Sequence, residues 1–318
     1  MSSPAAGRGE LAASAGVLVT AMCWGSMVPL TSLLLASLPP FMIAATRYTA
    51  AIPVLAVLIA VIEEGAILPR ELPWRRILLL GSLGIGGFAT CYTFGIWYSD
   101  PITAAAILAT GPVVAALMER LMAGRRVTRR ALAAITLTVA GGLMVAVARP
   151  QSGFTAHGGE VLLVVGLACW TWYSMKAQAW LTPLGIGQLR LTMVTSGAAG
   201  LSLWAVYAVT ATLGLQPPPA AWPSGASVAI LAYLSLGPTA ICIALWNFGT
   251  ARLGVTVAMV ILNLSPVFAL LLGMTLGAQP TVLQLTGGAV TLAGVLWLQF
   301  GGRRPARRAS VDAIGQRR

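Results

Sequence analysis

Charged residues are scarce in this sequence, which has one lysine and one histidine. Of its 318 residues only 9% are charged, whereas an ordinary soluble domain is about 25% charged. A water-soluble fold with so little charge would not stay in solution. The histidine, His157, and the four cysteines are not at metal-ligand spacing, and glycine-rich phosphate loops are absent. We therefore expect no soluble domain, no catalytic residues, no cofactor, no bound metal and no disulfide.

Apolar residues are what the sequence has in excess. They make up 58% of the chain, and the mean hydropathy is +0.85. A helix needs about 20 mostly apolar residues to cross the hydrocarbon core of a bilayer. The predicted fold class is an all-α integral membrane protein of ten transmembrane helices. The expected segments are 14–35, 40–62, 76–98, 101–122, 129–148, 159–180, 183–209, 226–248, 254–275 and 281–300.

The basic residues predict the orientation, because cytoplasmic loops carry an excess of Lys and Arg. Most of the 20 basic residues fall on one side of the expected segments, in runs such as 125–130 and 303–308, and the other side has only Arg149. Both termini are therefore expected in the cytoplasm, in a multi-pass protein of the plasma (inner) membrane. The basic loops would contact anionic lipid headgroups, and no nucleic-acid partner is expected.

The two halves of the sequence resemble each other. A shift of 154 residues places 92–113 on 246–267 without a gap. Five helices are an odd number, so the second copy must be inverted in the membrane. We predict a first repeat at 1–150, an inverted repeat at 151–302 and a basic tail at 303–318. The matched pairs are Trp24 with Trp170, Arg47 with Arg190, Tyr92 with Trp246, and Pro112 with Pro266.

Polar residues inside apolar segments are costly and usually face a cavity or a partner. Arg47 and Arg190 could anchor a carboxylate at either mouth of the protein. Alternatively, each extends to its nearest interface or holds helix-end carbonyls. Glu119 is the only acid well inside an expected span, and an ion pair with the cluster that begins at Arg120 would explain it. The sequence therefore offers no obvious proton-binding site.

Aromatic and amide side chains complete the candidate substrate site. Rings that converge from several helices would line an apolar cavity with a few hydrogen-bonding groups. The alternatives are an interfacial aromatic belt for the rings and helix–helix bonding for the amides. Matched prolines could act as hinges or simply pack. The candidates are Trp24, Tyr92, Trp170, Trp246, Asn247 and Asn263 for binding, and Pro112 and Pro266 for gating.

This pattern resembles the EamA-type members of the drug/metabolite transporter superfamily. The resemblance rests on the Cys-Trp pairs at 23–24 and 169–170, on the paired arginines and on the paired prolines, in the same order in each half. It implies ten helices in two inverted repeats, and within the family it is greatest to the YddG-type exporters of aromatic and other neutral amino acids. One departure is that "AGRRVT" and "LGAQPT" stand where the family often has a Gly-Glu-Arg-type turn.

The expected function is export of small neutral metabolites, most of all aromatic and other neutral amino acids, by alternating access. The partners would be the small-molecule substrate, the lipid bilayer and, through glycine-rich faces at 141–142 and 287–288, a second copy in a homodimer. Two alternatives remain open. One is a proton-driven multidrug or metabolite exporter of the same superfamily, and the other is a membrane scaffold or enzyme that transports nothing.

Overall fold

The computed structural model describes residues 4–35, 37–68, 71–98, 107–147, 159–216, 218–219, 223–275 and 279–300. The expected basic tail, Arg149 and His157 lie outside these ranges. Within them all regular secondary structure is helical. The protein therefore belongs to the all-α class.

Among the described residues of the first half, six α-helices and one π-helix have assigned bounds. Their bounds are α1 (Pro4–Leu34), α2 (Pro40–Ile62), α3 (Trp74–Leu79), the π-helix η1 (Leu80–Gly86), α4 (Gly87–Trp97), α6 (Gly111–Ala123) and α7 (Arg129–Val147). Because α3, η1 and α4 follow one another without a break, they form one continuous helical segment.

The second half follows the same order and adds a 3₁₀ turn, η2, and a short helix, α12, whose counterpart lies partly outside the described residues of the first half. Its bounds are α8 (Gly159–Trp180), the 3₁₀ turn η2 (Thr182–Leu184), α9 (Gln188–Thr212), α10 (Gly225–Leu234), the π-helix η3 (Ser235–Ile241), α11 (Cys242–Leu253), α12 (Val255–Leu262), α13 (Ser265–Thr275) and α14 (Val282–Phe300). The π-helices η1 and η3 stand at equivalent places in the two halves.

Local chemistry sets several helix ends. Proline has a fixed φ and no N–H, so it suits the first helical position, where Pro40 opens α2. The Ser224 side chain accepts a hydrogen bond from the backbone N–H of Ser227 and caps α10. Gly124 ends α6 with φ at 65°, which favours glycine. Gly185 has φ at 72° and ends η2, so α9 begins at Gln188 and not at 183 as the apolar run suggested.

Six helical stretches among the described residues are long and apolar enough to cross a membrane. They are Gly9–Met27, Pro40–Ile62, Trp74–Gly95, Gln188–Thr212, Gly225–Leu253 and Val255–Leu272. A shorter apolar helix covers Val282–Leu298.

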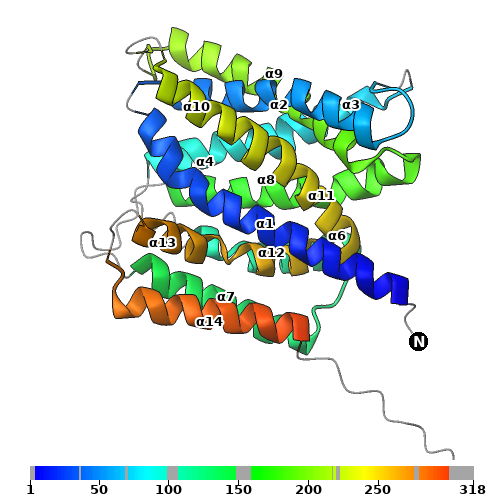
Figure 1. Ribbon diagram of the computed structural model, residues 1–318, viewed down its shortest axis with the longest axis vertical. Helices are drawn as coiled ribbons and strands as arrows, with labels where there is room; N and C mark the ends of the chain where they lie inside the picture. The colour runs from blue at the N-terminus through cyan, green and yellow to red at the C-terminus, as the bar shows by residue number, and fades with distance from the viewer. Residues whose placement is uncertain are drawn as a thin grey trace, which may run out of the picture.

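The helices lie side by side across the molecule (Figure 1). The α2 and α9 helices pack against each other at one edge, and α7 and α14 form a pair at the opposite edge. Between these edges α1 packs against α11, α4 against α8, and α6 against α12. Each of these pairs joins the first half of the chain to the second, so the halves share one core.

Glycines allow the close approach of α7 and α14. A Cβ at Gly141 would lie 2.5 Å from the Gly287 carbonyl oxygen, and a Cβ at Gly287 would lie 2.7 Å from the Gly141 oxygen. Side chains cannot come so close, so only glycine fits at either place. The predicted close-packing face is therefore present, and Gly141 and Gly287 face each other across it within one chain.

Candidate functional site

Three tryptophans from three helices meet in the core. Trp24 of α1 lies with its ring centroid 5.3 Å from that of Trp170 in α8 and 5.9 Å from that of Trp246 in α11. The centroids of Trp170 and Trp246 are 5.8 Å apart. These separations fall within the range of about 4.5–7 Å that aromatic pairs prefer. Three of the four predicted aromatic residues thus form one cluster, in which the rings contact one another.

The cluster extends from Trp170 to the helix α4. The Phe88 ring centroid lies 5.4 Å from that of Trp170 and 5.5 Å from that of Tyr92, the fourth predicted aromatic residue. Trp246 is fully buried and Trp170 is 4% exposed, whereas Trp24, Phe88 and Tyr92 are half-buried. The cluster therefore has a closed interior and a partly accessible edge.

The three indole N–H groups of the cluster differ in their partners. Trp24 Nε1 donates to the Pro238 carbonyl oxygen at 2.9 Å, and Trp246 Nε1 donates to Ser174 Oγ at 2.9 Å. Trp170 Nε1 is buried and has no hydrogen-bond partner among the described residues. An unpaired buried donor costs about 1–3 kcal/mol. This N–H is therefore the one indole donor of the cluster that no described group satisfies, and a bound molecule could reach it only if the buried interior opened.

Asn247 is fully buried and joins three helices. Its Nδ2 donates to Tyr173 Oη of α8 and to Thr192 Oγ1 of α9, each at 2.9 Å. The Tyr173 ring in turn lies 5.4 Å from the Trp170 ring, centroid to centroid. The Asn247 amide thus holds in place one wall of the aromatic cluster.

Asn263 lies where a helix breaks. The α12 helix ends at Leu262, and α13 starts at Ser265, followed by Pro266. The equivalent break in the first half is at Thr110, followed by Gly111 and Pro112. Asn263 Nδ2 donates to the Ala109 carbonyl oxygen at 2.9 Å. One broken helix is therefore hydrogen-bonded to the other at the break, and each predicted hinge proline stands just after it.

Arg47 is buried, with 9% of its surface exposed. Its Nε and Nη2 donate to Thr239 Oγ1 of η3 at 3.3 and 3.2 Å, and Nη2 also lies 3.4 Å from Met27 Sδ. These described partners are all neutral. Because Trp24 bonds to Pro238 and Arg47 bonds to Thr239, the guanidinium and the aromatic cluster meet at consecutive residues of one π-helix.

Arg190 is held differently from Arg47. It is the third residue of α9 and pairs with Glu63, with Nη1 3.3 Å from Oε2. Its Nη2 also donates to the Glu64 carbonyl oxygen at 3.1 Å. The two matched arginines are therefore not equivalent, since an acidic side chain neutralises Arg190.

Glu119 of α6 caps a helix of the other half. Its Oε1 accepts from the backbone N–H of Val255 at 2.9 Å, and its Oε2 accepts from Thr256 Oγ1 at 3.0 Å. These groups form the first turn of α12, where unpaired N–H groups favour a carboxylate. This helix cap, and not the expected ion pair with the cluster at Arg120, accounts for the half-buried position of Glu119.

A family model matches the chain in two parts. The EamA-like transporter family model matches residues 11–147 and again residues 157–300. The chain belongs to this family. The resemblance seen in the sequence is thereby confirmed, and the chain is a membrane transporter and not an enzyme. Membership of the EamA-like family also removes the alternative of a scaffold or enzyme that transports nothing.

Individual relatives of this EamA-like transporter are distant. A probable terminal-alkyne amino-acid exporter of Streptantibioticus cattleyicolor is 27% identical over 309 residues, which cover 95% of this chain and 97% of the relative. The uncharacterized transporter YyaM of Bacillus subtilis is 24% identical and covers 69% of this chain and 71% of its own.

A solved structure shows the same fold. It is described only as the crystal structure of a protein, and it matches this EamA-like chain with a TM-score of 0.75 at 21% identity. The match covers 92% of this chain and 98% of the other. At this identity the match shows the fold alone.

Several residues of the site were not identified from the sequence of this EamA-like chain. Phe88 bridges Trp170 and Tyr92, but phenylalanine in an apolar run carries no distinguishing signal. Thr239 binds Arg47 because η3 places it there, and π-helices have no reliable sequence signature. The proline inside that segment, Pro238, was the available hint, since prolines perturb helical hydrogen bonding.

Proposed function

We propose that this transporter exports small neutral amino acids, aromatic ones above all, through ten transmembrane segments arranged as two inverted repeats. The two matches to the family model, at 11–147 and 157–300, support the repeats. The equivalent π-helices and the equivalent helix breaks support them further. Both termini would be cytoplasmic, with the arginine-rich loops against anionic headgroups.

The substrate site lies at the partly accessible edge of the aromatic cluster. Trp24, Phe88 and Tyr92 are half-buried there, so a side chain of the substrate could stack on their rings without opening the closed interior. Trp170 Nε1, which no described group uses, lies in the closed interior, so it would donate to a substrate oxygen only after the cluster opens during transport. Asn247 and Asn263 would position the helices around this site through the bonds described above.

Arg47 would bind the substrate carboxylate. The observation that carries this proposal is the burial of the Arg47 guanidinium among neutral described partners. A buried guanidinium whose described partners are all neutral is costly in a membrane, and a carboxylate satisfies it in bidentate geometry. Aromatic rings favour a cation on their faces, so the ammonium group of a zwitterion suits the neighbouring cluster. Arg190 would not bind substrate in this conformation, because Glu63 occupies it.

The substrate class agrees with one relative. The Streptantibioticus cattleyicolor protein, aligned over 95% of this chain, is a probable amino-acid exporter. An amino acid carries the carboxylate, the ammonium group and the side chain that Arg47 and the rings would bind. Export would result from alternating access, in which the two halves expose this site to each side of the membrane in turn.

Flux measurements in proteoliposomes test the proposal. Purified protein should give saturable counterflow of labelled phenylalanine, methionine and threonine, with phenylalanine bound most tightly because its ring stacks on the cluster. Liposomes without protein and an excess of unlabelled phenylalanine are the controls. If none of the three amino acids shows saturable flux, the amino-acid assignment is wrong.

A further inference from the structure

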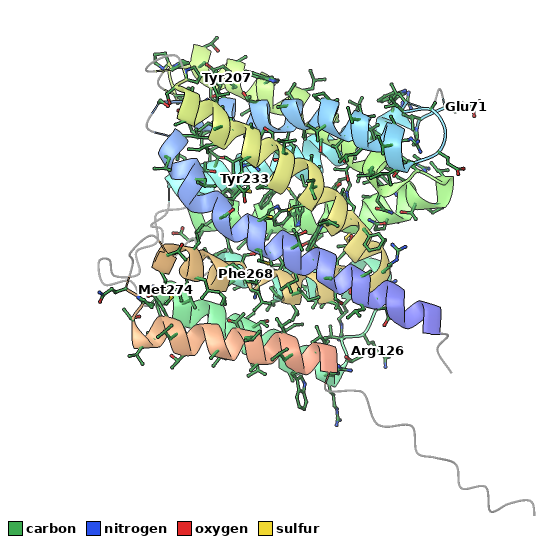
Figure 2. The ribbon with its side chains drawn as sticks, viewed as in Figure 1. Glu71, Arg126, Tyr207, Tyr233, Phe268 and Met274 are labelled. Carbon is green, nitrogen blue, oxygen red and sulfur yellow. The ribbon has the colours of Figure 1, made fainter. Side chains whose placement is uncertain are left out.

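We propose that Glu63 and Glu119 are gate residues that hold one end of the transporter closed by capping helices of the opposite half. This end is called the basic end and comprises residues 63–68 and 71–73, the loop 124–128, the turn 181–187 and Gly254. The inference rests on the proposed transport function. Figure 2 shows Glu71 and Arg126 at this end of the molecule, and Tyr207 and Met274 at the other.

The first gate contact joins α2 to α9. Glu63 is the residue that follows α2, and its Oε1 accepts from the backbone N–H of Leu189 at 3.0 Å in the first turn of α9. Its Oε2 lies 3.3 Å from Arg190 Nη1. A carboxylate at a helix N-terminus is stabilised by both the free N–H groups and the helix dipole.

Gly187 provides independent support for this contact. A Cβ at Gly187 would lie 2.2 Å from Glu63 Oε1 and 2.4 Å from Oε2. The carboxylate therefore sits directly on the backbone, in space that only glycine leaves open. Gly187 itself has φ at −62°, which any residue adopts. A methyl group there would displace the carboxylate without straining the backbone.

The second gate contact joins α6 to α12. Glu119 Oε1 accepts from the N–H groups of Val255 and Thr256 at 2.9 and 3.4 Å, and Oε2 accepts from Thr256 Oγ1 at 3.0 Å. Both gate acids thus belong to the first half of the chain, and both capped helices belong to the second. The halves cannot separate at the basic end while these caps persist.

The opposite end has a neutral counterpart of the Glu63 cap. Gln216 follows α9, and its Oε1 accepts from the backbone N–H of Phe41 at 3.3 Å in the first turn of α2. The α2–α9 pair is therefore capped at both ends, by a carboxylate at the basic end and by an amide at the other. Charge-assisted hydrogen bonds are about twice as strong as neutral ones. We infer that the resting transporter is closed at the basic end and opens first at the other.

Distances between spin labels test the gate. Labels at Leu68→Cys and Leu184→Cys report on the basic end, and labels at Leu35→Cys and Leu213→Cys report on the other; all four positions are exposed. The protein would be the full chain in liposomes, with its native cysteines replaced by alanine. In the Glu63→Ala/Glu119→Ala variant, the fraction with the long distance at the basic end should rise about tenfold or more.

Two further variants keep the test decisive. Gly187→Ala leaves both acids in place and should also lengthen the distance at the basic end, because it displaces the Glu63 carboxylate. Gln216→Ala is the matched control and should leave that distance unchanged. An unaltered basic-end distance in both Gly187→Ala and the double variant would overturn the gate.

The readout is independent of the substrate. Distances that shift as expected, together with absence of amino-acid flux, would keep the gate and refute the proposed substrate. Saturable amino-acid flux with unchanged distances at the basic end would keep the proposed substrate and refute the gate.

Discussion

The indole N–H of Trp170 lacks a hydrogen-bond acceptor among the described residues, unlike the indole N–H groups of its neighbours Trp24 and Trp246. A buried donor without a partner destabilises the empty protein, and a substrate oxygen can relieve that cost. The same ring type can thus serve packing at one position and recognition at the next.

Replacing Trp170 by phenylalanine should separate these roles. Trp170→Phe keeps an aromatic ring and removes the unpaired N–H, so KM for phenylalanine should rise about tenfold while the melting temperature is unchanged or higher. Trp246→Phe is the control, because it breaks the bond to Ser174 and should cost about 1 kcal/mol of stability with less effect on KM. Equal KM values for Trp170→Phe and wild type would rule out a bond to substrate.

Arg47 can be tested by changing the substrate as well as the protein. Wild-type protein should bind phenylalanine at least about tenfold more tightly than phenethylamine, which lacks the carboxylate, and Arg47→Gln should abolish that preference. Competition against labelled phenylalanine measures both affinities. If the preference survives in Arg47→Gln, the carboxylate binds elsewhere and Arg47 serves only to bond Thr239.

At the scale of elements, the two broken helices control how the halves can move. Both breaks are followed by a proline, and Asn263 bonds one break to the Ala109 carbonyl of the other. Pro266 cannot donate to the Leu262 carbonyl, and Ser265 Oγ does so at 2.7 Å in its place. A break satisfied by a side chain can bend without exposing a backbone group.

Restoring the backbone donor should stiffen the break. Pro266→Ala supplies an N–H for the Leu262 carbonyl, so the maximal transport rate should fall severalfold while KM stays within about twofold. Pro53→Ala, inside the unbroken α2, is the matched control and should leave the rate unchanged. Initial rates across a range of substrate concentrations give both constants. A normal rate in Pro266→Ala would mean that the proline only packs.

Part of this architecture follows from the sequence, and part depends on tertiary contacts. Apolar run lengths predicted the bounds of α2, α7, α8 and α14 to within a residue, but α1 begins ten residues before the expected start. The shift of 154 residues placed Pro112 and Pro266 at equivalent breaks. The start of α9 was misplaced, because the turn at Gly185 is apolar and resembles a span. The caps by Glu63 and Glu119 join residues more than 100 positions apart in the sequence. Such long-range contacts cannot be predicted from a local sequence pattern.

At the scale of the whole molecule, the arrangement of arginines predicts which end faces the cytoplasm. Cysteine labelling in intact cells should modify Leu213→Cys, which lies at the end opposite the basic end, with a reagent that cannot cross membranes. Leu68→Cys should react only after the cells are opened, because the basic end would be cytoplasmic. Both side chains are exposed, so poor access does not explain a negative result. The reverse pattern would invert the topology.

The neutral surroundings of Arg47 have an electrical consequence. If Arg47 binds a zwitterionic amino acid as proposed, the site carries the same positive charge whether empty or loaded, because the substrate has no net charge. If the Arg47 charge moves through the transmembrane field as the halves move, the free energy of that movement changes by up to about 2.3 kcal/mol per 100 mV of membrane potential. Voltage would then change the rates of the two half-cycles in opposite directions, while each complete cycle moves no charge and the final concentration ratio is independent of voltage.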